Sequence, residues 1–443
     1  MKRKLAICSL LFLASFAVRF LVWQTNKIEM ATVQSVVTEN YLRDADALAG
    51  GDIRTFLSGA NPPSNARVID HPPGYPLMMG VVESMTGFET WRHLQLALNS
   101  LAAVVVFLIA DLLFAPSIAL ISGILTVLSP QFAYHSGLIL PDELSVLPIL
   151  AAIYFWVLLS RSPRLRDAML CGVCLGLSCW LRSNALLLPL YFVATVLLIV
   201  PKHSRIHYAA ILIIAFIVVI APITLRNAFY FGSFIPLSLG GGTTFVEGLG
   251  DIDDGSRGLP RTDEDVMRLD ARIEGSENEY SGLYDPNGVE RDRRRTQFGL
   301  SVIRSEPLWF ASGVAARGLS TLRLERVPAI SAERDRRDTT PAAFYWLDRP
   351  LKLLQRAFLT AAFLPFVLLG LIVLVIRRRW REVAMLLVVP IYYATVQPLV
   401  HTEYRYVLST PHLLMISVAV GMCWLCGKVA GIVRGDRETT ART

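Results

Sequence analysis

Residues 207–226 read HYAAILIIAFIVVIAPITLR, and stretches of this kind decide the fold. The segment holds no acidic residue and no lysine, and its single arginine, Arg226, is its last residue. A helix of about 20 apolar residues crosses a hydrocarbon core of about 30 Å. The segment therefore predicts a membrane span. Nine further segments predict spans in the same way: residues 5–23, 92–113, 117–134, 142–160, 168–182, 184–200, 353–376, 383–399 and 407–427.

Composition supports the same class of protein. Of the 443 residues, 53% are hydrophobic, which excludes a soluble globular protein and a disordered chain. The net charge of +7 does not indicate a nucleic-acid partner, because most of the basic excess falls in loops that we assign to the cytosol. We therefore predict an all-α polytopic membrane protein with about ten transmembrane helices.

The cysteines predict neither disulfides nor a zinc site. All six lie inside apolar segments, and the two Cys-x-x-Cys pairs have no His or acidic neighbour that would complete a set of four ligands. In such surroundings cysteine behaves as a small apolar residue. The positions are Cys8, Cys171, Cys174, Cys179, Cys423 and Cys426.

Basic residues orient the chain in the membrane, since cytosolic loops carry an excess of Lys and Arg. Clusters precede the first predicted span and follow the fourth, sixth, eighth and tenth spans, which puts all of them on one side. We therefore expect cytosolic N- and C-termini in the inner or plasma membrane, with the first span retained rather than cleaved as a signal peptide. The clusters are residues 2–4, 161–166, 202–205, 377–381 and 428–434.

Two long segments then lie outside the cytosol. Residues 24–91 form an exoplasmic loop within an N-terminal transmembrane catalytic module, 1–226. Residues 227–350 form a second exoplasmic loop region, and 351–443 hold the C-terminal transmembrane helices and a cytosolic tail. In the second region, residues 297–322 alternate apolar and basic side chains around a proline, which predicts an amphipathic helix pair on the membrane surface.

Polar groups that suggest chemistry gather at the outer ends of the spans. A transporter would place its costly polar groups near mid-bilayer. The central parts of the predicted spans carry almost no charge, and Asp111 sits near a cytosolic helix end. We therefore predict chemistry at the outer interface, on a substrate presented there. The polar segments are residues 41–51, 71–76, 141–143, 225–227 and 403–406.

The first polar segment predicts a short helix just outside the first span. Residues 38–51, TENYLRDADALAGG, begin with a capping residue and end in glycine. Tyr41 and Asp44 share one helical face there, and Asp44 and Glu39 are candidate catalytic carboxylates. The alternative is that Glu39 pairs with Arg43 and that Asp44 is merely solvated.

Two further segments combine rigidity with charge. Residues 71–77, HPPGYPL, predict a stiff loop held against a cleft, or merely a rigid start of the next helix, with His71 and Tyr75 as candidate substrate-binding residues. Pro141 with Asp142 and Glu143 predicts a helix start, where the macrodipole stabilises acidic side chains. Asp142 would therefore organise a substrate or a cation rather than act as the base.

Two arginines are predicted on the outer side, although most Lys and Arg residues near the spans lie on the cytosolic side. Arg226 ends the seventh predicted span and Arg405 begins the tenth. Such residues often only snorkel to the interface. However, guanidinium forks match phosphate oxygens in geometry and keep their charge. We therefore predict that both bind a lipid phosphate, with Asn227, Glu403 and Tyr404 as neighbouring substrate-binding candidates.

These motifs together resemble one family. The chain looks like a GT-C glycosyltransferase of the dolichyl-phosphate-mannose protein mannosyltransferase and aminoarabinose transferase type. The resemblance implies a GT-C-like helical bundle with two exoplasmic loop regions that carry short amphipathic helices. It rests on the Tyr41, Ala45, Leu48 and Gly51 spacing, on residues 71–77, on 225–227 with FGSFIPLS at 231–238, and on EYRY at 403–406 with Pro411.

The resemblance also implies a reaction. A sugar would pass from a polyprenyl-phosphate donor to an acceptor on the exoplasmic face by inverting displacement, with Asp44 or Glu39 accepting the acceptor's proton. The family usually has an acidic residue where Val37 stands, so the choice of base stays open. The second acidic motif of the family falls on Asp142, with Glu143 beside it, and the resemblance makes both candidate catalytic residues.

Topology bears on the partners. Nucleotide sugars are cytosolic, so an outward-facing site needs a membrane-borne donor. Because arginines can neutralise the leaving phosphate, no metal is required, and a divalent cation at Asp142 is the one cofactor left open. The acceptor is a lipid, a glycan or a protein, and the sequence does not select the sugar. The alternative functions are a lipid-linked oligosaccharide polymerase or ligase, and a transporter or flippase of lipid-linked glycans.

Overall fold

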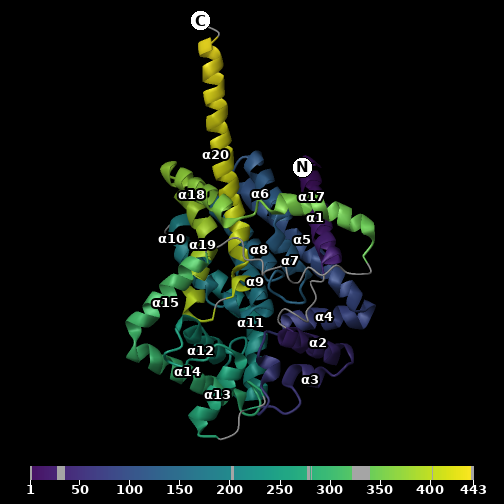
Figure 1. Cartoon of the computed structure of the whole chain (residues 1–443), viewed down its shortest axis with the longest axis vertical. Coiled ribbons are helices and arrows are strands. Elements are labelled where there is room, and N and C mark those ends of the chain that lie inside the picture. Colours follow the sequence, from purple (N-terminus) through teal and green to yellow (C-terminus); the bar gives the residue numbers. More distant parts are fainter. Residues whose placement is uncertain are drawn as a thin grey trace.

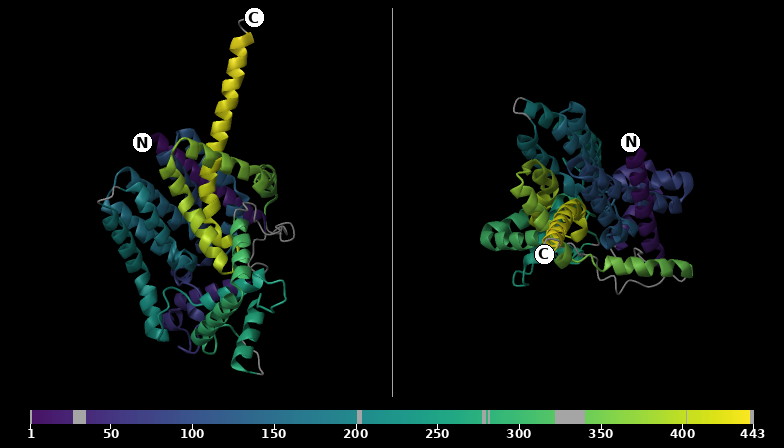
Figure 2. Two further views of the ribbon diagram at one scale, coloured as in Figure 1. Left: turned by 90° about the vertical axis from the view of Figure 1, so that its left-hand side faces the viewer. Right: turned by 90° about the horizontal axis from the view of Figure 1, so that it is seen from above.

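The computed structural model describes residues 2–26, 35–200, 204–276, 280, 282–321, 340–401 and 403–440. Every regular element within these ranges is helical, which confirms the all-α prediction. Figure 1 shows a bundle of long helices and, at the end away from both termini, a group of shorter helices. The two termini therefore lie at the same end of the molecule, as the perpendicular views in Figure 2 also show.

The long helices account for the membrane-spanning character. Within the described residues, five helical segments are long and apolar enough to cross a membrane, and two bent helix pairs pass the same test together, with bends of 49° and 54°. The five are α1 (Lys2–Thr25), α5 (Phe88–Leu113), α11 (Arg205–Phe231), α19 (Trp380–Val396) continued by the turn η4 (Gln397–Leu399), and α20 (Ser409–Thr440) over its part Ser409–Lys428. The bent pairs are α6 (Pro116–Leu128) with α7 (Pro130–Gly137), and α17 (Ala342–Gln355) with α18 (Thr360–Ile376).

Shorter apolar helices complete the bundle. They are α8 (Val146–Arg161), α9 (Leu165–Leu181) and α10 (Leu188–Ile199), with the turn η2 (Ser183–Ala185) between the last two. Asp111 lies two residues before the end of α5, so its predicted position near a helix end is confirmed, and Lys4 of α1 lies 2.6 Å from it.

Three predicted spans begin or bend differently from the expectation. The span 117–134 breaks where Pro130 opens α7, because proline has no N–H to continue the hydrogen bonding of α6. The span 353–376 is bent by 54° between α17 and α18, and α18 starts only at Thr360. The predicted helix start at Pro141 is wrong. Residues 142–145 form a turn, closed by the Ser145 N–H donating to the Pro141 carbonyl at 2.8 Å, and α8 begins at Val146.

The outer helices come from the two predicted loop regions. Figure 1 shows α2, α3 and α12 to α14 together at the end opposite the termini. The expected helix pair around Pro307 is present as α14 and α15, which break at Glu306. The outer elements are α2 (Ser35–Ala49), α3 (Ile53–Ser58), η1 (Arg67–Ile69), α4 (Gly74–Thr86), α12 (Gly241–Ile252), α13 (Asp263–Glu274), α14 (Gly288–Ser305) and α15 (Pro307–Ser320).

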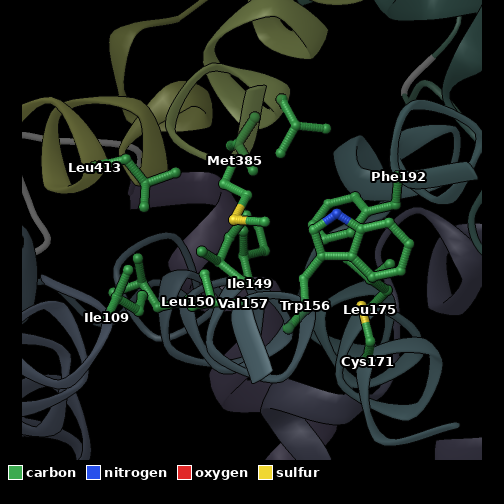
Figure 3. Close-up of a cluster of buried hydrophobic side chains, with 14 of the residues drawn as sticks. Ile109, Ile149, Leu150, Trp156, Val157, Cys171, Leu175, Phe192, Met385 and Leu413 are labelled. Atoms are coloured by element: carbon green, nitrogen blue, oxygen red, sulfur yellow. The ribbon is translucent and has the colours of Figure 1, made fainter. Parts of the chain in front are cut away.

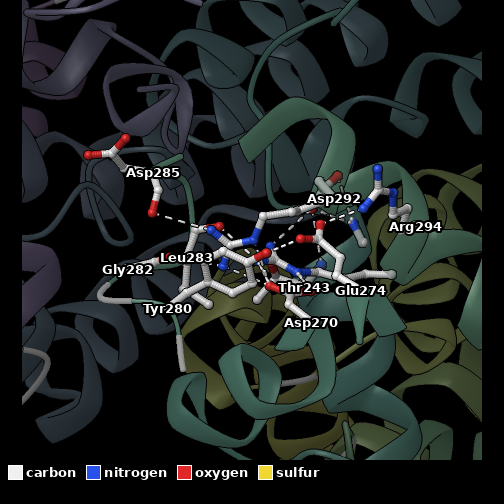
Figure 4. Close-up of polar contacts among 12 residues, drawn as sticks. Thr243, Asp270, Glu274, Tyr280, Gly282, Leu283, Asp285, Asp292 and Arg294 are labelled. Atoms are coloured by element: carbon white, nitrogen blue, oxygen red, sulfur yellow. Dashed lines mark hydrogen bonds and ion pairs between the residues drawn. The ribbon is translucent and has the colours of Figure 1, made fainter. Parts of the chain in front are cut away.

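A buried ion cluster holds the second outer region together (Figure 4). The Asp270 carboxylate of α13 accepts hydrogen bonds from Arg291 at 2.8 Å and from Arg295 at 3.0 Å, both on α14. The backbone N–H groups of Gly242 and Thr243, at the start of α12, donate to Asp292 at 3.0 and 3.1 Å. That helix N-terminus is therefore already occupied by a carboxylate.

The apolar core surrounds α8. Trp156 is fully buried, packs edge to face on Phe192 of α10, and donates from its indole nitrogen to Thr195 at 3.0 Å. Figure 3 shows this tryptophan between Met385 of α19 and Cys171 of α9. The cysteines are free thiols, as the sequence predicted. Burial of this kind leaves the polar turn before α8 firmly placed at its outer end.

Close backbone packing joins α9 to α11, the most extensive helix pair of the described residues. Gly172 and Gly176 lie four residues apart on α9, in the small-xxx-small pattern that lets membrane helices approach closely. A Cβ atom on Gly172 would come within 2.2 Å of the Leu212 carbonyl oxygen of α11. This contact fixes the end of α9, where the site begins.

Replacing Gly172 with alanine should lower stability by about 1–3 kcal/mol, because the added methyl group forces the two helices apart. Gly427→Ala is the matched control, since nothing lies within 4 Å of a Cβ at that helical position. The midpoint of thermal unfolding in detergent measures both. Equal midpoints for the two variants would show that the close approach is not required.

Candidate functional site

The centre of the site is a buried carboxylate between two guanidinium groups. Asp142, in the turn before α8, lies 2.9 Å from Arg182 and 3.7 Å from Arg405. Arg182 follows the last residue of α9, and Arg405 belongs to the turn η5 (Tyr404–Val407) before α20. The exposed fractions of the three residues are 3%, 8% and 4%, so the surroundings screen their charges little.

A second carboxylate completes the group. Glu403 accepts two hydrogen bonds from Arg405, at 2.7 and 2.9 Å. The Arg182 guanidinium lies over the Tyr406 ring, 4.6 Å from its centre. Although burial opposes the charged form of His401, the Asp251 and Glu403 carboxylates raise its pKa to about 10. The site thus carries several fixed charges of both signs.

A cavity of about 570 Å³ opens beside these groups. Its polar lining includes Asp70, His71 and Arg182, and its apolar lining includes Leu187, Val396 and Leu399. The apolar residues come from the start of α10 and the end of α19, and these two helices pack against each other. The cavity is therefore amphipathic, because charged and apolar side chains line the same space.

Two hydrogen bonds brace the wall of this cavity. The Asn184 amide of η2 donates to the Tyr406 carbonyl at 2.7 Å. The Tyr392 hydroxyl of α19 donates to the Asn184 carbonyl at 2.6 Å. One residue thus ties three segments of the chain around the cavity, and the wall does not depend on any single helix.

A second, much smaller pocket of about 10 Å³ adjoins the cavity. Asp44, Arg67 and Arg226 line it, and Asp70 and His71 line both spaces. Burial raises the pKa of Asp44 to about 6, and Arg67, 3.4 Å away, partly offsets that rise. Burial also lowers the pKa of His71. A weakly acidic carboxyl group therefore faces a space about the size of one water molecule.

Comparison with known proteins shows what this chain is similar to. The family model described as dolichyl-phosphate-mannose-protein mannosyltransferase matches residues 70–225, which include Asp70, Asp142 and Arg182. An oligosaccharyltransferase from Archaeoglobus fulgidus, solved in complex with Zn and sulfate, aligns with a TM-score of 0.51 and 14% identity. The alignment covers 96% of this chain and 49% of that one. The chain has the GT-C fold.

The remaining comparisons add less. ArnT from Cupriavidus metallidurans bound to undecaprenyl phosphate aligns over 94% of this chain and 77% of that one, with 15% identity and a TM-score of 0.38. Curated protein sequences give no significant match. This GT-C chain spans about half the length of the Archaeoglobus enzyme, and it is an integral membrane protein.

The GT-C chain holds no ready-made metal site among its described residues. No three His, Cys, Asp or Glu side chains within those ranges are arranged to hold an ion. The acidic residue that the sequence offered for a divalent cation, Asp142, faces two guanidinium groups instead. Its negative charge is thus already balanced by the protein.

The structure brings together only part of the predicted site. Arg405, Glu403 and Asp142 meet around one point, and Tyr404 contacts the ring of His135 at 5.4 Å beside them. Glu143, next in the chain to Asp142, faces the opposite way into the bundle. The second residue of the turn therefore has different partners from the first.

The predicted residues of the first outer region also separate. Asp44 and His71 line the pockets, and Tyr41 stacks 5.1 Å from the His71 ring. Tyr75 is fully buried, donates to Gln95 at 2.8 Å, and lines neither pocket. Glu39 is exposed on α2 and lines neither pocket.

Arg226 and Asn227 lie apart from Arg405. Arg226 lines the small pocket, and its Nε donates to Asn227 at 3.1 Å. The Asn227 amide donates to the Ile235 and Leu237 carbonyls, both at 3.0 Å. Asn227 thus shapes the FGSFIPLS loop that forms one wall of the cavity, a role that the sequence could not distinguish from substrate binding.

Sequence reasoning missed several residues of the site, among them Asp70 and Arg182. Asp70, which precedes the HPPGYPL motif and lines both pockets, was left out of that motif. Arg182 was noticed only as the boundary between two spans. An arginine between two outer span ends was the available signal, because it breaks the same charge bias as Arg226 and Arg405.

Replacing Asn227 with alanine should lower stability by about 1–3 kcal/mol, because two buried carbonyls lose their donor. Thermal unfolding in detergent measures the change, with the exposed Asn61→Ala as the matched control. A midpoint equal to that of the wild-type protein would favour the substrate-binding role instead.

Proposed function

We propose that this chain is a membrane glycosyltransferase that takes a sugar from a polyprenyl-phosphate donor and transfers it to an acceptor on the exoplasmic face. The amphipathic cavity is the observation that carries the proposal, because it joins a guanidinium to an apolar groove between two membrane helices. The GT-C fold and the mannosyltransferase family match support the same reaction class.

The phosphate would bind against the polar lining of the cavity. Arg182 belongs to that lining, and Arg405 lies on the other side of Asp142. One Arg405 nitrogen, Nη1, is buried without a hydrogen bond, and so is one Arg226 nitrogen at the small pocket. Guanidinium groups held in place by carboxylates stabilise the growing charge of a phosphate leaving group without further reorganisation.

The polyprenyl chain would lie along the apolar lining of the cavity and extend from there into the membrane. Leu187 and Leu399 are 46% and 41% exposed, and both line the cavity between α10 and α19. Apolar side chains that are exposed on a membrane helix face lipid, so a hydrocarbon tail can pass there without meeting water. A water-soluble nucleotide sugar would gain nothing from such an opening.

We propose Asp44 as the base of an inverting displacement. A carboxyl group with a pKa near 6 is largely ionised at neutral pH yet basic enough to accept a proton from an attacking hydroxyl. Asp70, between the two pockets, would hold the acceptor against the anomeric carbon. Glu39 is the less favoured base because of its exposure.

Orientation and cofactors complete the proposal. The charge bias supports cytosolic termini, and the common end of both termini supports an exoplasmic site at the opposite end. We propose that no metal is needed, because two guanidinium groups already face Asp142 and can neutralise the phosphate. The acceptor would be a lipid, a glycan or a protein.

Arg182→Gln should weaken binding of undecaprenyl phosphate about tenfold to 100-fold, since a charged hydrogen bond contributes about 1.5–3 kcal/mol. Equilibrium binding to the purified protein measures it, with thermal unfolding as the check on folding. Arg54→Gln is the matched control, because that arginine is exposed on α3 and lines neither pocket. Unchanged affinity in a folded Arg182→Gln protein would refute the phosphate role. A strict requirement for a diphosphate-linked donor would favour the oligosaccharide ligase instead.

The transfer rate should rise with pH through about 6, because Asp44 must lose its proton before it can accept one. Asp44→Asn should reduce the rate by about 10²–10⁴-fold, and Asp46→Asn, on the exposed face of the same helix, should not. Arg67→Gln should move the rising limb to higher pH, because Arg67 lowers the pKa of Asp44. If the rise of the transfer rate occurs at the same pH in Arg67→Gln as in the wild type, Asp44 is not the base.

A further inference from the structure

A second charged pair lies inside the bundle, behind the site. Arg19 of α1 and Glu143 of the turn before α8 have no exposed side-chain surface, and Arg19 Nη2 lies 3.3 Å from Glu143 Oε1. Neither residue lines either pocket. Arg19 falls within the predicted span 5–23, so the expectation that the spans carry almost no charge missed this residue.

Arg19 and Glu143 have partners on three helices. Arg19 also donates to Ser15 of its own helix, and to Ser136 of α7 at 2.9 Å. His412 of α20 places Nε2 at 3.3 Å from the same Glu143 oxygen. The His412 ring stacks on Phe132, with 3.4 Å between ring centres. Glu143 therefore connects its turn to α1 and α20 at once.

The hydrogen bonding of His412 determines which of its ring nitrogens faces Glu143. Its Nδ1 faces the Leu408 carbonyl at 2.8 Å, so that nitrogen is the donor of this hydrogen bond. Nε2 is thereby turned toward the Glu143 carboxylate. With Phe132 holding the ring plane, the imidazole cannot turn away without losing both contacts.

Stability alone does not account for these charges. An apolar set of similar volume would be at least as stable in a buried position, because an ion pair must first lose its hydration. What the ion pair contributes instead is a fixed position for the turn that holds Glu143. Glu143 directly follows Asp142, in a turn that the Ser145 hydroxyl closes by donating to the Asp142 carbonyl at 2.7 Å. A shift of the Glu143 side chain is therefore transmitted to the Asp142 carboxylate.

We propose that Glu143 is a positioning residue: held by Arg19 and His412, it keeps Asp142 between the Arg182 and Arg405 guanidiniums. It acts through Asp142 and touches no reacting atom. The sequence assigned it to catalysis beside Asp142, whereas its contacts face away from the cavity. The functional consequence rests on the proposed function, since those guanidiniums are the proposed phosphate site.

Binding of undecaprenyl phosphate to Asp142→Asn, Glu143→Gln and the double variant tests this inference. Glu143→Gln should weaken binding about tenfold or more through displacement alone. The double variant should bind no more weakly than Asp142→Asn, because both changes act at one point. Losses that multiply in the double variant would overturn the proposal. Ser417→Ala, buried on α20, is the matched control.

A readout without ligand separates this inference from the proposed function. In Glu143→Gln, backbone amides of residues 137–146 should exchange hydrogen for deuterium faster than in the wild type, and those of α9 should not. Unchanged exchange across 137–146 would refute the positioning role. If the wild-type protein binds no polyprenyl phosphate, the proposed function fails, and the exchange result still decides the role of Glu143.

Two variants of His412 test the same proposal if Glu143→Gln does not fold. His412→Gln places an amide group beside the Glu143 oxygen, whereas His412→Leu removes every polar group at that position. Exchange in residues 137–146 should therefore be close to wild type in the first variant and faster in the second. Equal exchange in both variants would also overturn the proposal.

Discussion

The arrangement of the site depends on one buried carboxylate. Asp142 lies between Arg182 and Arg405. These three residues come from distant parts of the chain, and almost no solvent reaches them. Removing one member of such a group leaves a buried charge without its partner, at a cost of about 3–5 kcal/mol. The end of α9, the turn before α8 and the turn before α20 are therefore held to one another by charge.

The rest of the architecture serves to bring these three segments together. Close packing of α9 on α11 at Gly172 fixes the helix that ends at Arg182. The apolar core around Trp156 fixes α8. Outside the bundle, the ion cluster around Asp270 ties α13 to α14, and the loop ordered by Asn227 closes one wall of the cavity. Apolar packing supplies the frame, and a few buried charges place its parts.

Much of the fold could be predicted from the sequence, because membrane-spanning helices are recognisable as long runs of apolar residues. The bend at Pro130 and the turn at Asp142 could not, since both depend on which hydrogen bonds the folded chain makes. For the site, the polar residues at outer span ends included Asp142, Arg405 and Asp44. That Tyr75 points into the core could not be predicted, because pairing between distant segments leaves no local pattern in the sequence.

The small pocket at Asp44 carries a consequence for selectivity. With a volume of about 10 Å³ it accommodates little more than a single oxygen atom. Under the proposed reaction, an alcohol on an unbranched stem would enter such a recess more readily than a secondary alcohol flanked by ring substituents. Regiochemistry would then be decided by steric exclusion around the nucleophile and not by affinity for the acceptor as a whole.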